Sequence, residues 1–350
     1  MRNLAIRLGC ALLIASMTAI ASAAAAAAGA APPTPAAAAF AQGQEHLARR
    51  TAADLRAAVE DFQRANAADT TFAPAFAGLA EARALLYDYL GAREAALRAI
   101  ALDDHLASAH AVLGFARLHG DWDWAGAETE LRRALEIDPQ GVTAHLWYAI
   151  VLEATGRSDE AVREARRAVE LQPREAHVRA GLGYRLYWAR HYDEAVGELK
   201  EAARLDPNLQ TAWYFIGRAR GQQGQFKEAR AAFARARELS PQDANLKSAG
   251  AYLEALAGQR RQAEKVLAEL ERLADRGFPV ASQVAGIHAA LGNKTAALAW
   301  LERAQAHREG ALIWLKADPR FDILRGEPRF TEILKRMGLP GGSGGVAPAS

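Results

Sequence analysis

Small and bulky apolar residues recur along the chain at a spacing typical of α-helices. Ala195 precedes Leu199 by four positions, and Ala229 precedes Phe233 by the same distance, so the members of each pair share one helix face. Gly217 stands ahead of the second pair, and we expect it where two helices approach closely, because glycine has no side chain to separate the backbones. No run of alternating β-branched or aromatic residues predicts a strand. The pattern predicts an all-α fold of packed helix pairs.

Prolines divide this helical pattern into units of constant length. They recur every 34 residues, at Pro139, Pro173, Pro207 and Pro241. A fixed period of that length indicates one helix pair copied along the chain. Three of the four follow an aspartate or a serine, which can cap a helix, and proline suits the first turn of a helix but not its interior. We therefore expect each proline to open a new unit.

The repeat extends over most of the chain. We predict about eight helix pairs between Ala39 and Glu309, with weaker copies at both ends, since terminal repeats are expected to be atypical. The third unit carries one extra residue in its turn, within the sequence His119-Gly120-Asp121-Trp122-Asp123-Trp124. Beyond the repeats, two similar helix starts predict short capping helices over the last repeat; they read Asp318-Pro319-Arg320-Phe321 and Glu327-Pro328-Arg329-Phe330. Repeats and cap together should occupy residues 39–340.

Residues 1–23 have the pattern of a secretory signal peptide. Two arginines precede an uncharged run, and an Ala-Ser-Ala sequence follows as a cleavage site. We expect cleavage there, an Ala/Pro-rich linker over residues 24–38, and a periplasmic or secreted protein; the alternative is an uncleaved N-terminal anchor. The single cysteine, Cys10, lies in the removed segment, so the mature protein can form no disulfide. Residues 341–350 should form a disordered tail.

The charge of the chain argues against nucleic acid as a partner. Its 43 basic and 41 acidic side chains give a net charge of +2, and both Arg2 and Arg7 lie in the predicted signal peptide. Their removal leaves 41 basic side chains against 41 acidic ones. Nucleic-acid-binding proteins usually carry a basic excess, because phosphate contacts supply much of their affinity.

The residue types at fixed offsets in each copy resemble those of the tetratricopeptide repeat. The family pattern is a bulky residue, Leu-Gly, Ala, an apolar residue four later, Ala and then Pro. The clearest copy here reads Trp213-x-x-Ile216-Gly217, Ala229-x-x-x-Phe233, Ala236 and Pro241. The resemblance covers roughly residues 40–339. It implies a right-handed superhelical solenoid whose first helices line a concave groove.

Three local sequences resemble the tetratricopeptide modules attached to bacterial winged-helix regulators, adenylate cyclases and protein kinases. They are the Asp-Trp-Asp-Trp turn, the Arg49-Arg50-Thr51 entry and the Asp-Pro-Arg-Phe ending. Those modules are taken to bind protein partners or to sense signals. Here a signal-like segment stands ahead of the repeats in place of a regulator or catalytic domain. A role in transcription or cyclic-nucleotide signalling is therefore not carried over.

The resemblance also implies which side chains face the groove. Positions on the first helices of the fourth to seventh units are mostly aromatic, and we predict them to bind a partner: Trp147, Ile150, Tyr184, Tyr187, Trp188, Tyr214, Phe215, Arg218 and Tyr252. Tyrosine and tryptophan provide a large contact area together with a polar group. The alternative interpretation is that each ring fills a gap between helices. The Lys and Asn residues with which some family members grip a C-terminal carboxylate are absent from these positions.

No constellation of side chains predicts catalysis. His119, Asp121 and Asp123 are candidates for a metal site, but their spacing matches no complete ligand set, and the histidines His177 and His191 have no nearby nucleophile or paired carboxylate. We therefore predict a non-enzymatic scaffold or adaptor of the cell envelope, without a cofactor, that binds a protein or peptide segment in its concave groove. The alternative is an envelope enzyme or enzyme-accessory subunit with an unrecognised site.

Overall fold

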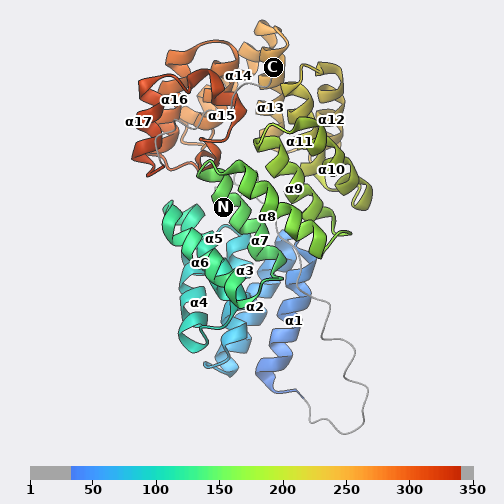
Figure 1. Ribbon diagram of the computed structural model, residues 1–350, viewed down its shortest axis with the longest axis vertical. Coiled ribbons are helices and arrows are strands. Elements are labelled where there is room, and N and C mark those ends of the chain that lie inside the picture. The colour runs from blue at the N-terminus through green and yellow to red at the C-terminus, as the bar shows by residue number, and fades with distance from the viewer. Residues whose placement is uncertain (1–32, 340–350) are drawn as a thin grey trace. The chain divides into compact units, whose positions relative to one another are not determined.

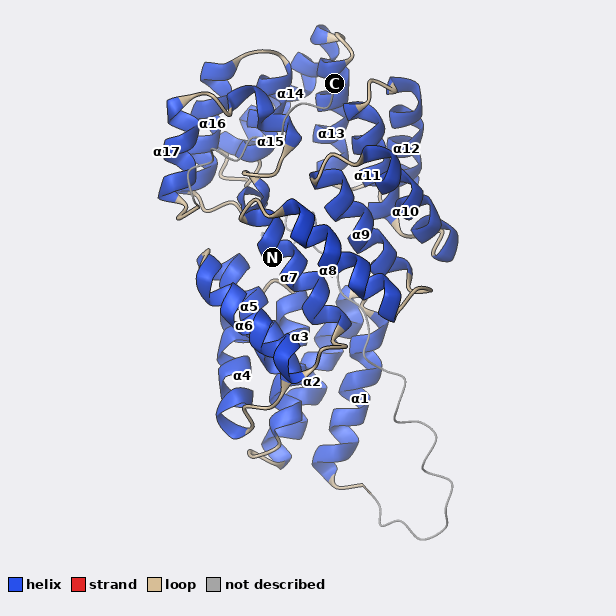
Figure 2. Ribbon diagram, viewed as in Figure 1, coloured by secondary structure: helices blue, strands red, loops and turns tan. Residues whose placement is uncertain are grey.

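The computed structural model describes residues 33–339, and all regular structure among them is helical (Figure 2). The predicted signal peptide, most of the linker and the predicted tail lie outside the described residues. In chain order the helices are α1 (Pro35–Arg49), α2 (Ala52–Ala68), α3 (Ala73–Leu85), α4 (Tyr89–Leu102), α5 (Ala107–Ala116), η1 (Arg117–Asp121), α6 (Trp124–Ile137), α7 (Val142–Ala154), α8 (Ser158–Leu171), α9 (Ala176–Trp188), α10 (Tyr192–Leu205), α11 (Gln210–Gln222), α12 (Phe226–Leu239), α13 (Ala244–Leu256), α14 (Arg260–Asp275), α15 (Ala281–Ala290), α16 (Lys294–Ala306), η2 (Gly310–Trp314), η3 (Pro319–Leu324) and α17 (Pro328–Arg336).

Helices α1 to α16 form eight consecutive pairs, which confirms the predicted all-α repeat (Figure 1). The first helix begins at Pro35, four residues before the expected start at residue 39, because Thr34 caps it and proline occupies its first position. By contact, the described chain divides into two compact units, residues 33–151 and 152–339. None of the described helices is long and apolar enough to span a lipid bilayer.

The turn between the two helices of a pair is set by one residue in the left-handed conformation. This residue recurs every 34 positions and is usually glycine; the positions are Trp122, Gly156, Arg190, Gly224, Gly258 and Gly292. The residue after it then donates its N–H to the carbonyl five positions earlier, as Gln225 does to Arg220. In the third unit Asp123 instead donates to Arg117, six positions earlier, across the π-helical turn η1. The extra residue predicted for this turn is therefore absorbed there.

Glycine also permits the close contact of paired helices. A Cβ atom on Gly183 would lie 2.6 Å from the side chain of Leu199, and one on Gly217 would lie 2.6 Å from the ring of Phe233. In the next layer, Phe233 packs against α13, where Leu246 is among the buried residues of the same cluster. The small residue on the first helix thus makes room for the bulky residue on the second, as the sequence predicts.

The C-terminal helices close the repeat array. Helix α17 contacts α16, and η3 contacts both α15 and α16. Three apolar residues of α17, Phe330, Ile333 and Leu334, are buried in this contact region. The prediction of short capping helices over the last repeat is confirmed.

Candidate functional site

Residues 310–324, here called the cap segment, also fold back onto the first helices of earlier repeats. The ring of Trp314 stacks on that of Trp188 in α9, with centroids 5.5 Å apart and an angle of 7° between the ring planes. Lys316 donates from Nζ to the carbonyl of Thr155, 2.9 Å away, just after α7. The cap segment therefore covers part of the surface on which the sequence predicts a partner.

Arg190 fixes the cap segment at the end of α9. It occupies the left-handed turn position that the neighbouring units fill with glycine, with φ of 70°. Its guanidinium donates to the carbonyl of Ala317 at 2.6 Å and to the carboxylate of Asp322 at 2.8 Å. Both contacts join residues that are far apart in the sequence. Arg190 therefore holds the cap segment in place, in addition to forming the turn after α9.

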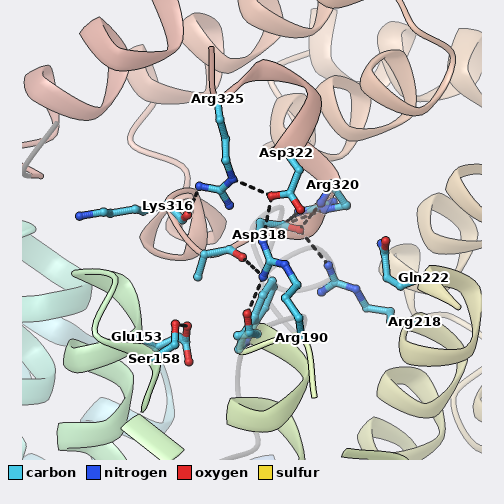
Figure 3. A network of polar contacts seen from close by, with 12 residues as sticks. Glu153, Ser158, Arg190, Arg218, Gln222, Lys316, Asp318, Arg320, Asp322 and Arg325 are labelled. Atoms are coloured by element: carbon cyan, nitrogen blue, oxygen red, sulfur yellow. Dashed lines mark hydrogen bonds and ion pairs between the residues drawn. The ribbon is translucent and has the colours of Figure 1, made fainter. Parts of the chain in front are cut away.

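Asp318 is the centre of a buried ion-pair network (Figure 3). It is 1% exposed, and its carboxylate accepts from Arg218 in α11 at 3.3 Å and from Nε of Arg320 at 2.8 Å. It also accepts from the backbone N–H of Arg320, which caps η3. Burial alone would raise the pKa of Asp318, but the two guanidinium groups offset it, so this pKa lies below its ordinary value of 3.8. The carboxylate of Asp318 is thus the shared counter-ion of two arginines.

A cavity of about 110 Å³ lies between α9, α11, α13 and the cap segment. Seven of its twenty lining residues are aromatic: Tyr184, Trp188, Tyr214, Phe215, Phe233, Tyr252 and Trp314. Three arginines are also among the lining residues, Arg185, Arg218 and Arg320. The cavity thus combines an apolar wall with a concentration of positive charge.

Six of the nine residues predicted to face a groove line this cavity, from Tyr184 to Tyr252 along the chain. Tyr187 does not; it is fully buried, and the guanidinium of Arg218 lies 4.7 Å from the centre of its ring. Trp147 and Ile150 belong to the N-terminal unit, where both are buried and Trp147 stacks on Phe115 at 4.5 Å. The structure therefore brings together the aromatic residues of the fifth to seventh repeats, whereas the two residues from the fourth do not line the cavity.

Among the predicted rings that line the cavity, those of the fifth repeat are the most buried. Tyr184 and Trp188 are buried, and the hydroxyl of Tyr184 donates to Thr211 at 2.7 Å. Tyr214, Phe215 and Tyr252 remain half-exposed. Core packing is thus the main role of the first two rings, and the other three retain surface for a ligand.

The sequence did not predict that residues of the cap segment take part in the site. It also did not predict the role of Arg185 in α9. The Asp-Pro-Arg-Phe sequence signalled a helix start, which Asp318 indeed caps, but its spacing carried no sign of the contact with Arg218. Arg185 was not singled out because it is not among the positions of α9 that the resemblance predicts to face the groove. Its burial follows from the stacking of its guanidinium 4.9 Å from the ring centre of Trp314.

Arg185 and Glu153 are two further buried charges near the cavity. Burial lowers the pKa of Arg185 to about 10, so it stays protonated at neutral pH. Burial raises the pKa of Glu153 to about 7, against the attraction of Arg185 and a hydrogen bond that Ser158 donates at 2.8 Å. The carboxylate of Glu153 is therefore only partly ionised at neutral pH and is a weak counter-ion for Arg185.

The three residues considered for a metal each have structural contacts. The ring of His119 stacks on Tyr89 at 5.3 Å, and burial lowers its pKa to about 3. Asp121 accepts from Arg93 at 2.6 Å. Asp123 caps α6 through the N–H of Gly126 at 2.9 Å. Each of the three side chains therefore has a structural role, in ring packing, in an ion pair or as a helix cap.

The sequence matches the family model described as tetratricopeptide repeat over residues 118–183 and 187–253. These two matched stretches of the chain are tetratricopeptide repeats. No curated protein matches the chain. Among solved structures, it is similar to Cut9–Hcn1 from an APC/C heterotetramer, with 18% identity and a TM-score of 0.54 over 62% of this chain and 42% of that one.

Two further solved structures are similar to this chain. The human IFIT1 dimer with PPP-AAAA shares 15% identity and a TM-score of 0.53, over 73% of this chain and 68% of that one. PilF of Pseudomonas aeruginosa shares 21% identity and a TM-score of 0.47, over 59% of this chain and 92% of that one. At these identities, the matches to Cut9–Hcn1 and IFIT1 support the fold alone.

Proposed function

We propose that this protein is an exported, non-enzymatic adaptor that holds a protein partner against the inner surface of its fifth to seventh repeats. Here the inner surface means the sides of α9, α11 and α13 that line the cavity. The observation that carries the proposal is the group of half-exposed rings at this cavity, Tyr214, Phe215 and Tyr252, in a repeat family that mediates protein–protein interaction.

Aromatic rings in a recess are suited to anchor a partner. They offer a large apolar area at low cost in side-chain entropy, and such anchors dominate the binding energy of many interfaces. The cap segment already covers Trp188 with Trp314. The partner in this proposal therefore contacts the rings that the cap segment leaves half-exposed and does not displace it.

The proposal is tested by crosslinking the full-length protein in its native host and comparing variants. Tyr214→Ala combined with Tyr252→Ala should lower the yield of the crosslinked partner strongly, because truncation of an anchor ring typically costs about 2 kcal/mol or more of binding. The matched control is Leu97→Ala, which removes an exposed apolar side chain from α4 in the other unit. All variants must first show the helical content and thermal stability of the wild type. Equal crosslinking by the folded double variant and the wild type would contradict the proposed surface.

Export forms the second part of the proposal and rests on the signal-like sequence of residues 1–23. A charged start, an uncharged run and an Ala-Ser-Ala sequence are together typical of a cleaved signal peptide. N-terminal sequencing of the native protein should give a first residue near Ala24. Recovery of Met1 in the membrane fraction would instead favour the anchored alternative.

A further inference from the structure

The guanidinium of Arg185 is buried without a hydrogen-bond partner among the described residues. The side chain is 1% exposed, and its Nε atom is fully enclosed and unpaired. It interacts instead with the ring of Trp314 and with the distant charge of Glu153, which is not within ion-pair distance. A buried guanidinium carries five donors and a large desolvation penalty, so an unpaired one is unusual in a folded protein.

The charges around the cavity do not balance. Three arginines are among the lining residues of the cavity, whereas no aspartate or glutamate of the described residues is. Asp318 lies behind Arg218 and Arg320 and is shared between them. Arg185, a lining residue of the cavity, therefore has a buried positive charge without a close counter-ion, and an anion in the cavity would supply one.

The size and wall of the cavity define what kind of anion fits. A cavity of about 150 Å³ is large enough for benzene, so the 110 Å³ found here suits a carboxylate on a short carbon chain. The aromatic wall favours an apolar body behind the charged group. Neutral polar residues also line the cavity, among them Asn245, Ser248 and Gln283. Ser248 donates its hydroxyl to the carbonyl of Asn245, and Gln283 donates to the side-chain oxygen of Asn245.

We propose that this cavity binds a carboxylate, with Arg185 as its charged partner, and that the carboxylate belongs to an acidic side chain of the protein partner. The second half rests on the proposed adaptor function. A planar guanidinium and a carboxylate match in geometry and can form two parallel hydrogen bonds. The site differs from the sequence-based expectation, in which Arg218 was the one charged residue among those predicted to bind a partner, because Asp318 already pairs with Arg218.

The side-chain analogues of glutamate and glutamine provide the direct test. The full-length protein is titrated with sodium propionate and with propionamide at constant ionic strength, and its Tm is followed. Propionate should raise Tm in a saturable way, whereas propionamide, which has the same shape but no charge, should not. Equal responses to the two probes would overturn the site, and a stronger response to inorganic phosphate than to propionate would overturn the assignment to a carboxylate.

Arg185→Met separates the charge from the packing, because methionine keeps an unbranched chain beside Trp314. The variant should lose propionate affinity by about ten-fold or more, as expected for loss of a charged hydrogen bond. Its own Tm should match or exceed that of the wild type, since an unpaired buried charge is removed. The matched control is Arg204→Met, which removes an exposed arginine paired with Glu201 on α10 and should keep the propionate response. An unchanged propionate affinity in Arg185→Met would refute the role of Arg185.

A measurement on the wild type keeps the test decisive even if Arg185→Met does not fold. The side-chain Nε–H resonance of Arg185, assigned by its absence in Arg185→Lys, should shift in NMR spectra on addition of propionate and stay in place with propionamide. Absence of any propionate-dependent shift would overturn the proposal.

The source of the carboxylate is decided by blocked peptides. The peptide Ac-Ala-Glu-Ala-NH₂ should displace propionate, and Ac-Ala-Gln-Ala-NH₂ should not. Binding of propionate without displacement by the glutamate peptide would assign the cavity to a free carboxylic acid and overturn the link to a partner. The two proposals can fail separately. If propionate does not bind but the double variant Tyr214→Ala, Tyr252→Ala still abolishes crosslinking, the carboxylate site is refuted and the adaptor function is supported.

Discussion

Trp188 and Trp314 stack almost in parallel, with their ring centroids 5.5 Å apart, although one ends a repeat helix and the other belongs to the C-terminal cap segment. This contact, together with the bonds from Arg190 to Ala317 and Asp322, joins the cap segment to the fifth repeat. In a repeat protein, each repeat mainly contacts its neighbours in sequence. A contact between the cap segment and the fifth repeat joins parts that are not neighbours, so it should make the unfolding of these repeats more cooperative.

The first prediction concerns this stacked pair. Trp188→Ala should destabilise the C-terminal unit by about 3 kcal/mol or more, as expected for truncation of a buried tryptophan. The double-mutant cycle with Trp314→Ala should give a coupling energy of about 0.5 to 1.5 kcal/mol, the usual range for aromatic pairs. Urea unfolding followed by far-UV circular dichroism provides the four stabilities. Strictly additive effects would mean that the rings lie close without stabilising one another.

The second prediction concerns the shared carboxylate. Asp318→Asn removes the negative charge between Arg218 and Arg320, and breaking a buried ion pair on one side typically costs about 3 to 5 kcal/mol. The control is Asp322→Asn, which breaks the pair with Arg190 at a side chain that is 46% exposed and should cost about 1 kcal/mol or less. Thermal unfolding of both variants is the measurement, and similar losses in the two would contradict the central role of Asp318.

The same carboxylate predicts how acid acts on the cap segment. Because the pKa of Asp318 in the fold lies below 3.8, the unfolded chain binds more protons in this range. Its stabilising contribution is therefore complete above pH 3.8 and is lost as the pH falls through the lower, folded value. Hydrogen exchange in η3 should accelerate more steeply with acid in the wild type than in Asp318→Asn; parallel pH profiles would contradict this assignment.

The repeat was predictable because each of its determinants is local. Gly217 and Phe233 must complement each other within one helix pair, and the one-residue insertion before Asp123 changes the spacing visibly. The same local rules identified Asp318 as a helix start, and the structure confirms it as the cap of η3.

These local rules could not predict that the cap segment packs against α9 and α11. The contacts of Trp314 with Trp188 and of Asp318 with Arg218 join positions outside the 34-residue period to positions within it. No single-sequence pattern relates such pairs, because the relation arises only when the helices are packed. For the same reason the sequence did not predict the burial of Arg185, since its ring contact comes from the cap segment.

The third prediction follows from the raised pKa of Glu153. In the fold this pKa is about 7, against an ordinary value of 4.5, so the folded state binds more protons between these values. Stability should therefore fall as the pH rises from about 4.5 to 7, by an amount on the order of 3 kcal/mol for this group. Glu153→Gln should reduce the slope and be more stable than the wild type at about pH 8, since glutamine mimics the neutral acid and can still accept from Ser158. The measurement is urea unfolding at several pH values, and a variant that is less stable than the wild type at the alkaline end would contradict the prediction.

The fourth prediction compares two glycines of the same repeat. Gly183→Ala would place a Cβ atom 2.6 Å from Leu199, in the contact between α9 and α10, and should destabilise the protein by about 1 to 3 kcal/mol through overpacking. Gly197 lies in α10, is exposed, and has no atom within 4 Å of the position that a Cβ atom would occupy. Gly197→Ala should therefore stabilise the protein by about 0.5 to 1 kcal/mol, because alanine has the higher helix propensity. Thermal unfolding of the two variants decides the matter. If both changes stabilise the protein, then Leu199 yields without cost and close packing does not require Gly183; if both destabilise it, then loss of stability at Gly183 cannot be assigned to the contact with Leu199.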